Sequence, residues 1–340
     1  MTTTEIPTVT PSPLPPPPRR RSRVKVAIIA LLSLAVLIVA AAIGFILYTG
    51  SKIERIPEAE VAALTPVASD APRNILVVGV DTRANLPGDF ENFGNPGSFA
   101  GSRTDVIMVM HFVPGRGAQL LSIPRDLRVD IPGSGTGKIN AATTVGGADA
   151  LIRVIQNELG IEVNNYMEID FAGFAEIVDS LGGVTLTFEN PARDTKSGFA
   201  VDAGTQVLDG EQALAYVRSR NHQELIGSSW ESTKGTDIGR TRRQQEVLIA
   251  LLGEAGSASN AFDLPGFVTT LAGQIRADAG LNTNVIVSLG RSAMQLRSGD
   301  IDALTLPVDI TTIGGVSYVV PNAKTQPALD AFNAGDLFPR

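Results

Sequence analysis

From residue 72 onward, apolar segments of strand length alternate with segments of helical periodicity. Short apolar runs, bounded by glycine and proline turns, predict strands over residues 74–80, 106–113, 118–123, 165–169, 184–188, 302–307 and 316–320. Apolar residues that recur every three or four positions predict helices over residues 147–159, 171–181, 237–252, 262–275 and 283–296, with another at the C-terminal end. No clear linker interrupts residues 72–340, so we expect one α/β (α+β) domain, with a mixed sheet flanked by helices on both sides.

The first 71 residues follow a different pattern. Residues 1–23 are rich in proline and end in a basic cluster, which predicts a disordered tail. The apolar run from Val26 to Tyr48 exceeds the roughly 20 residues that span a bilayer, so we predict a transmembrane helix over residues 24–48. Because the basic cluster precedes this helix, the N-terminus is expected in the cytoplasm. Residues 49–71 would then be a tether, and residues 72–340 an exported domain of a single-pass cell-membrane protein.

A cleaved signal peptide is the alternative interpretation of the same segment. Ala40–Ala42 is a candidate cleavage site. The apolar part of a signal peptide usually has only about 7–15 residues, however, and this run is longer. The uncleaved anchor is therefore the favoured reading, and both readings export the body of the chain.

The composition narrows the possible chemistry. The 340-residue chain has a formal net charge of −7, although residues 1–50 contain five basic residues and one acidic residue. The strongly acidic remainder should not bind nucleic acid through its overall field, so any anion site must be local. The absence of cysteine excludes thiol catalysis, disulfides and cysteine-ligated zinc. His111 and His222 are too few for a polyhistidine metal site.

Two arginines lie close together within this acidic body. Asp209 and Gln212 resemble a capping box for a short helix that leads into Tyr216–Arg220, which we interpret as a strand. Side chains two residues apart on a strand share a face, so Arg218 and Arg220 would point the same way. Surface ion pairs are the alternative, but two arginines on one face favour an anion site.

A predicted helix adds further basic residues. Asp237 is a suitable N-cap, and Gly253 would end the helix. The helical repeat places Arg240 and Gln244 on an inward stripe with apolar residues, turns Arg242 outward, and leaves Arg243 undecided. Arginines in a first helical turn oppose the helix dipole. A phosphate bound among the guanidinium groups and the helix N–H donors would explain them.

Polar residues also bracket the first three predicted strands. If these strands run up, down and up, five residues meet at one edge of the sheet: Asp81, Arg83, Arg103, Asp105 and Arg125. Taken alone, Asp81 and Asp105 would be ordinary turn and strand-end residues. Together with three arginines, they are suitable ligands for Mg²⁺, which uses one or two carboxylates and phosphate oxygens.

The glycine-rich segment 131–140 is not a nucleotide-binding P-loop. Pro132 stands where the first glycine should be, and Ile139 replaces the Ser or Thr that holds magnesium. We predict a flexible loop that brings Lys138 and Asn140 to the cleft.

These segments together resemble the LytR–CpsA–Psr family of cell-envelope proteins. The motifs that carry the resemblance are Arg103-Thr-Asp105, Ser122-Ile-Pro-Arg125-Asp126, Lys138-Ile-Asn140, Asp170-Phe-Ala-Gly-Phe174, Val178-Asp-Ser-Leu-Gly-Gly-Val184, Tyr216-Val-Arg218-Ser-Arg220 and Asp237-Ile-Gly-Arg240 with Gln244. They run in order from about Asn74 to Leu252. One departure is Leu127, which replaces a common threonine.

The resemblance implies a Mg²⁺-dependent phosphotransferase, with Mn²⁺ as a possible substitute. Such an enzyme moves a glycopolymer from a polyprenyl-pyrophosphate carrier to a peptidoglycan hydroxyl and holds the prenyl chain in an apolar tunnel. Asp81 and Asp105 would bind the metal. The pyrophosphate would be bound by Arg83, Arg103, Arg125, Lys138, Arg218, Arg220, Arg240 and Gln244.

The catalytic group would comprise Asp105, Arg125, Arg218, Arg220 and Asp237. Asp105, Asp126 and Asp237 are all candidates for the base that accepts the proton of the acceptor hydroxyl.

Two other functions are alternatives: hydrolysis of a polyprenyl pyrophosphate, and a non-catalytic role as a membrane-bound transcriptional attenuator or scaffold. The acidic exported body argues against direct DNA binding.

Overall fold

The computed structural model describes residues 44–45, 47–81, 103–113, 117–232, 237–255, 264–282, 285–286, 288 and 301–336. The predicted tail and nearly all of the predicted membrane span lie outside these residues, as does most of the predicted helix over 283–296. No helix among the described residues is both long and apolar enough to cross a bilayer.

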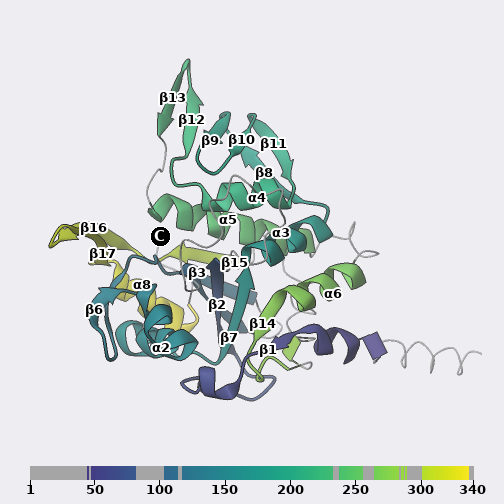
Figure 1. Cartoon of the computed structure of the whole chain (residues 1–340), viewed down its shortest axis with the longest axis vertical. Helices are drawn as coiled ribbons and strands as arrows, with labels where there is room; N and C mark the ends of the chain where they lie inside the picture. Colours follow the sequence, from purple (N-terminus) through teal and green to yellow (C-terminus); the bar gives the residue numbers. More distant parts are fainter. Residues whose placement is uncertain are drawn as a thin grey trace, which may run out of the picture. The chain divides into compact units, whose positions relative to one another are not determined.

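A mixed sheet of seven strands forms the centre of the fold, in the order β1–β14–β7–β2–β3–β4–β15 (Figure 1). These strands are β1 (Glu54–Arg55), β2 (Arg73–Asp81), β3 (Arg103–Val113), β4 (Gly117–Ser122), β7 (Asn165–Asp170), β14 (Ile275–Ala277) and β15 (Ile301–Thr305). β2, β3 and β4 pair antiparallel, which confirms the up–down–up prediction. Since β7 runs parallel to β2, the ends of β2, β4 and β7 and the start of β3 share one edge, here called the site edge.

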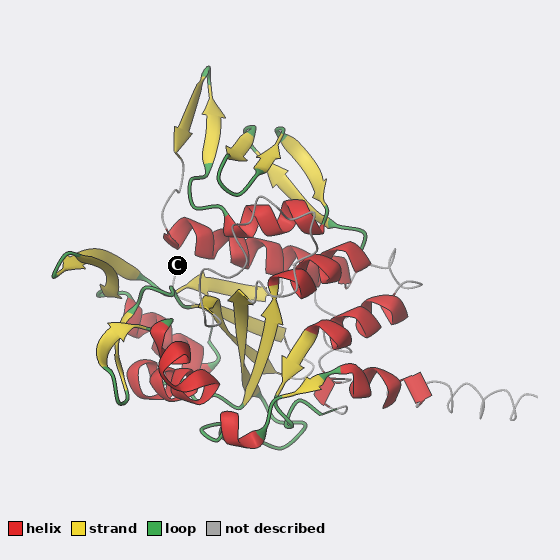
Figure 2. Cartoon of the chain, in the orientation of Figure 1, coloured by secondary structure: helices red, strands yellow, loops and turns green. Residues whose placement is uncertain are grey.

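Helices cover both faces of this sheet, as predicted (Figure 2). Alternate residues of each strand point to opposite faces. Leu76 and Val78 pack into the core formed with α2 (Ala141–Leu159) and α8 (Thr325–Ala334). The opposite face, which includes Ile75, packs against α6 (Leu264–Gln274), and α5 (Asp237–Ala255) lies over β4 and β15.

A second apolar core lies beyond α5. It joins α3 (Phe171–Ser180), α4 (Gly210–Arg218) and α5 to two small sheets. One sheet pairs β8 (Val184–Phe188) with β11 (Gly204–Leu208). The other has the order β10–β9–β12–β13, formed by β10 (Phe199–Val201), β9 (Ala192–Asp194), β12 (Gln223–Ile226) and β13 (Ser229–Ser232). The sequence analysis did not predict this four-stranded sheet, because its strands are too short to show a clear alternation.

The structure corrects the interpretation of the two arginines at 218 and 220. The capping box of Asp209 and Gln212 is present, but α4 continues through Arg218, and Ser219 is its C-cap. Tyr216 and Val217 favour strands by intrinsic propensity, but both are buried in the second core, and this packing overrides the propensity. Arg218 therefore ends a helix and Arg220 follows it, so the two do not share a strand face.

Two other predicted boundaries also change. The glycine-rich segment forms a hairpin, β5 (Arg128–Ile131) with β6 (Gly135–Lys138), instead of a flexible loop. Gly133 and Gly135 adopt the positive φ angles that allow its tight turn.

Asp237 is the first residue of α5 rather than its N-cap, and α5 continues past Gly253. A hairpin of β16 (Val308–Ile313) and β17 (Val316–Pro321) follows β15.

Part of the segment assigned to a tether packs onto the domain. β1 pairs with β14, and Ile53, Ile56 and Val61 are buried. A short 3-10 helix, η1 (Glu58–Glu60), follows β1. Burial of these apolar side chains favours docking of this stretch over an extended chain.

A β-bulge lies at the site edge, where β2 meets β3. Val80 pairs with Thr104 and Gly79 pairs with Val106, so Asp105 is the extra residue. The two backbones approach closely here: a Cβ on residue 79 would lie 2.8 Å from the Cβ and Cγ2 of Val106. Bulges redirect side chains at functional edges. Gly79 therefore permits the irregularity that positions Asp105.

We expect Gly79→Ala to lower the free energy of unfolding by roughly 1–3 kcal/mol, because the added methyl group clashes with Val106. Gly266→Ala is the matched control, since its Cβ meets nothing within 4 Å and alanine favours helices. Denaturant unfolding followed by circular dichroism measures both. Equal stability of the two variants would contradict the assigned role of Gly79.

Candidate functional site

Asp105 is the centre of a cluster of arginines at the site edge. Its Oδ1 accepts a hydrogen bond from Nη1 of Arg125 and lies 3.6 Å from Nη2 of Arg220 and 4.0 Å from Nη1 of Arg240. These residues come from the start of β3, the turn after β4, the segment after α4 and the first turn of α5. The structure thus brings together four of the predicted site residues that are distant in sequence.

A second carboxylate extends the cluster on one side. Asp126 Oδ1 lies 2.7 Å from Lys138 Nζ, and Asp126 Oδ2 lies 3.8 Å from Arg125 Nε. Lys138 ends β6, which is held to the turn after β4 by a hydrogen bond from Asn140 N to Arg125 O. The hairpin therefore delivers Lys138 to the site, as predicted for the segment despite its different structure.

Arg218 and Gln244 lie close in sequence to the residues of this cluster: Arg218 ends α4, two residues before Arg220, and Gln244 lies one turn after Arg240 on α5. The Arg218 guanidinium stacks over the Phe171 ring, 4.8 Å from its centroid, at the start of α3. Gln244 Nε2 donates to the carbonyl of Val217, 3.4 Å away, so it connects α5 to the end of α4. We call the set around Asp105 and Asp126 the cation cup; its cations are Arg125, Lys138, Arg218, Arg220 and Arg240.

The remaining predicted residues are described only in part. Asp81 and Arg103 are paired across β2 and β3 at the site edge, but only their backbones are described. The same holds for Asp237 at the start of α5. Arg83 lies outside the described residues.

Asp194 is a site residue that the sequence analysis missed. Its carboxylate is 1% exposed, and its Oδ2 accepts hydrogen bonds from Ser219 Oγ at 2.7 Å, Arg220 N at 2.9 Å and Asn221 N at 2.7 Å. Burial raises the pKa of this carboxyl, but hydrogen bonds from Ser219, Asn221 and the Lys196–Ser197 turn outweigh burial and hold the pKa below its usual value. Asp194 therefore fixes the backbone that carries Arg220. Its only sequence signal is an Asp that precedes a Lys-Ser-Gly turn.

Arg243, which the sequence left undecided, is buried behind the cup. It is 3% exposed and donates from Nη2 to the carbonyl of Ser219, between the two predicted arginines. Burial holds the pKa of its guanidinium below the usual value, although Tyr216 and nearby carboxylates partly offset this effect. Arg243 thus supports the segment 218–220 through the carbonyl of Ser219, while Asp194 accepts from its N–H groups.

The α/β domain, with the ordered motifs gathered at one edge of its sheet, agrees with the class of protein that the motifs suggest. The LytR_cpsA_psr family model matches residues 47–332. The chain belongs to this family.

Individual relatives agree with this assignment. The chain is similar to a probable cell wall biosynthesis protein, LcpB of Corynebacterium glutamicum, with 34% identity over 80% of the chain and 63% of LcpB. It is 30% identical to the polyisoprenyl-teichoic acid–peptidoglycan teichoic acid transferase TagV of Bacillus subtilis, over 74% of the chain and 59% of TagV. The chain thus spans about three fifths of the length of these curated relatives.

A solved structure shares the fold. The LytR-Csp2A-Psr enzyme from Actinomyces oris superimposes with a TM-score of 0.64 at 28% identity, over 83% of this chain and 96% of that one.

Replacing Asp194 should destabilise the segment that carries Arg220. Asp194→Asn would replace a carboxylate that accepts several hydrogen bonds by an amide, whose NH₂ group faces the same donors. We expect the free energy of unfolding to fall by roughly 1–3 kcal/mol at pH 7. Because the pKa of Asp194 is depressed in the folded state, its contribution is complete above the unfolded value of about 3.9 and is lost as pH falls below it.

Unfolding at a series of pH values from 6 to 3 measures this effect. The stability of the wild-type protein should fall more steeply with acidification than that of Asp194→Asn. Asp202→Asn, at an exposed position, is the control. Parallel pH profiles for wild type and Asp194→Asn would show that the buried carboxylate does not stabilise the fold.

Proposed function

We propose that this protein transfers a glycopolymer from a polyprenyl-pyrophosphate carrier to a hydroxyl group of peptidoglycan. The observation that carries the proposal is the convergence of three guanidinium groups on Asp105. The name of TagV, a polyisoprenyl-teichoic acid–peptidoglycan teichoic acid transferase, supports the reaction class.

The cup suits a diphosphate. Of the side chains that the structure describes, the cup has five cations and two carboxylates, and guanidinium groups can bind phosphate oxygens through paired N–H donors. The N–H groups at the start of α5 add a positive dipole beside Arg240. Transfer of a phosphoryl group depends chiefly on positioning and on charge stabilisation, and these residues supply both.

The donor set is compatible with Mg²⁺, with Mn²⁺ as a substitute. The three ion pairs of Asp105 with described residues all involve Oδ1, so Oδ2 would be its oxygen for a cation, and Asp81 on the facing strand would supply a second carboxylate. The described residues contain no group of three or more acidic, His or Cys side chains arranged for a metal. Mg²⁺ commonly uses one or two carboxylates and completes its shell with phosphate oxygens and water. When bound, it would neutralise charge on the diphosphate.

A loosely packed apolar region next to the cup could accommodate the prenyl chain. Between α5 and strands β3, β4 and β15, Met108 and Leu120 are buried, but the apolar side chains around them are only partly buried: Val106, Met110, Leu248, Ile249, Leu252 and Ala303. Val106 directly follows Asp105, and Leu248 lies one helical turn after Gln244. Apolar surface left partly exposed beside a polar site favours an apolar ligand.

The reaction breaks one bond and forms one. The oxygen of the acceptor hydroxyl attacks the phosphorus that carries the sugar, the bond from this phosphorus to the bridging oxygen breaks, and the lipid leaves as its monophosphate. The arginines of the cup hold the charge on both phosphate groups. The hydroxyl proton passes to a base, for which Asp105, Asp126 and Asp237 stay the candidates.

An N-terminal anchor over residues 24–48, with the N-terminus in the cytoplasm, would keep the domain near its lipid-linked donor.

Removing a cup arginine should stop transfer while the fold stays intact. Arg220 is 52% exposed, so Arg220→Ala leaves little cavity, but it removes a cation from the diphosphate site. We expect transfer by the full chain, assayed with a lipid-linked donor and peptidoglycan, to fall roughly 10²–10³-fold. Arg153→Ala, which removes a 51% exposed arginine from a surface ion pair on α2, is the control.

Product analysis separates transfer from hydrolysis. Transfer gives polymer joined to peptidoglycan through a phosphodiester, whereas hydrolysis gives free polymer phosphate whether or not peptidoglycan is present. Full transfer by Arg220→Ala, or free polymer phosphate as the sole product of the wild type, would count against the proposal.

Chelation tests the metal. We expect a chelator to abolish transfer and Mg²⁺ or Mn²⁺ to restore it, because the diphosphate needs a cation besides the arginines. Asp105→Asn should need a higher metal concentration for half-maximal rate, as it loses one anionic ligand. Undiminished transfer in the presence of excess chelator would exclude a metal requirement.

A further inference from the structure

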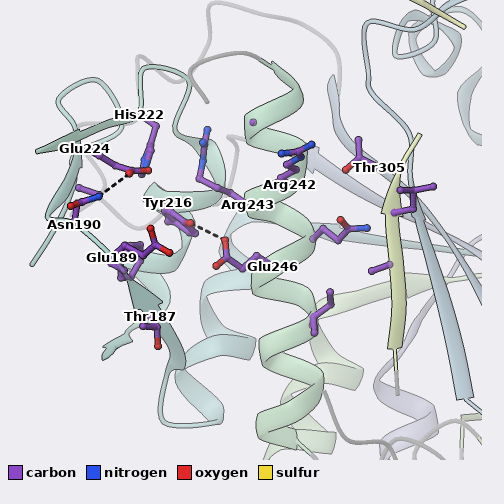
Figure 3. A pocket seen from close by; sticks show the side chains of 17 residues that line it. Thr187, Glu189, Asn190, Tyr216, His222, Glu224, Arg242, Arg243, Glu246 and Thr305 are labelled. Atoms are coloured by element: carbon purple, nitrogen blue, oxygen red, sulfur yellow. Dashed lines mark hydrogen bonds and ion pairs between the residues drawn. The ribbon is translucent and has the colours of Figure 1, made fainter. Parts of the chain in front are cut away.

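A groove of about 650 Å³ crosses α5 next to the cation cup, within the size range of ligand sites (Figure 3). Its floor is a stripe of α5 formed by Gly239, Arg242, Glu246 and Ile249. One wall comes from the segments before β9 and at β12, which contribute Asn190 and Glu224, and the other from residues 303–305 of β15. None of these residues belongs to the cup.

The groove contains polar groups that lack protein partners. Arg243 lines it and is 3% exposed, yet its Nε and Nη1 are buried without a hydrogen-bond acceptor among the described residues. The Oγ1 of Thr305 is likewise buried without a partner in the part of the chain that the structure describes. Buried donors without acceptors are costly, so a ligand or water that satisfies them is expected.

The charges in the groove do not suit a second phosphate or a lipid. Three carboxylates, those of Glu189, Glu224 and Glu246, line it with the guanidinium groups of only Arg242 and Arg243. A second diphosphate would be repelled by this acidic set. A prenyl chain would leave the charged groups desolvated. A neutral ligand with many hydroxyl groups fits better, because each hydroxyl both donates and accepts.

The groove is also placed for a reacting sugar. Gly239 precedes Arg240 of the cup, and Arg243 donates to the carbonyl of Ser219, between Arg218 and Arg220. A saccharide in the groove would therefore lie beside the diphosphate site. We propose that this groove binds a neutral saccharide portion of one of the two substrates, either the peptidoglycan acceptor or the sugars of the donor. This inference rests on the function proposed above.

Two substitutions change polar groups of the groove without touching the cup. Thr305→Val removes a hydroxyl and keeps the shape, and Arg242→Gln removes an exposed guanidinium that forms no hydrogen bond or ion pair with another described residue. Thr185→Val and Arg153→Gln are controls at exposed positions outside the groove. The measured quantities are the KM for peptidoglycan glycan fragments and the KM for the lipid-linked donor, with the full chain in detergent.

We expect each groove variant to raise one KM about three- to tenfold, as loss of one hydrogen bond predicts, with little change in kcat. A raised KM for the glycan fragments assigns the groove to the acceptor, and a raised KM for the donor assigns it to the donor sugars. Unchanged values for both substrates in both variants would overturn the proposal while leaving the transfer function intact.

A direct measurement of saccharide binding tests the groove even if the wild-type protein transfers no polymer. The probe is then a purified glycan fragment of peptidoglycan, or the sugar portion of the donor released from its lipid, titrated into the full chain by calorimetry. Weaker binding to Arg242→Gln, with unchanged binding to Arg220→Ala, would support the groove independently of the reaction. Equal binding to Arg242→Gln and wild type, or no binding of either probe, would reject it.

Discussion

The attraction between one carboxylate and three guanidinium groups holds the cup together. Arg125, Arg220 and Arg240 repel one another, and Asp105 offsets this repulsion where the three chain segments meet. Because Asp105 is only 15% exposed, water screens these charges less than on an open surface. Among the described side chains the cup nevertheless keeps an excess of positive charge, since Asp126 is the one further carboxylate paired with its cations. That excess is what a diphosphate would neutralise.

Backbone geometry makes this attraction possible. The bulge opposite Gly79 sets the position of Asp105, and the hydrogen bonds accepted by Asp194 fix the segment that carries Arg220. Arg243 supports the same segment from α5. Asp105 and Arg220 are thus each held in place by a neighbour that need not touch the substrate. Such support keeps charged groups in position before a ligand arrives, which reduces the reorganisation needed for reaction.

The sequence predicted the strands of the central sheet well, because β2, β3 and β4 are long, apolar and bounded by clear turns. It also predicted that Asp105 and Arg125 would meet if the three strands run up, down and up, and the structure has this order. It failed at Tyr216–Arg220, where burial in the second core outweighs strand propensity. Asp194 was missed because the partners that connect it to the site, Ser219, Arg220 and Asn221, are more than 20 residues away, a relation with no periodic signal. The sheet of β9, β10, β12 and β13 was missed for the related reason that its strands have only three or four residues each.

Helix α5 links the parts of the site because its faces serve different neighbours. Arg240 and Gln244 face the cup, Leu248 faces the partly packed apolar region, and Arg242 and Glu246 form the floor of the groove. A helix repeats every 3.6 residues, so residues 240, 244 and 248 form one stripe and residues 239, 242, 246 and 249 form another. A diphosphate, its lipid and a sugar could therefore be bound along a single rigid element. The first turns of α5 fix the spacing between these groups, and this spacing limits which bond of the donor can reach an acceptor hydroxyl.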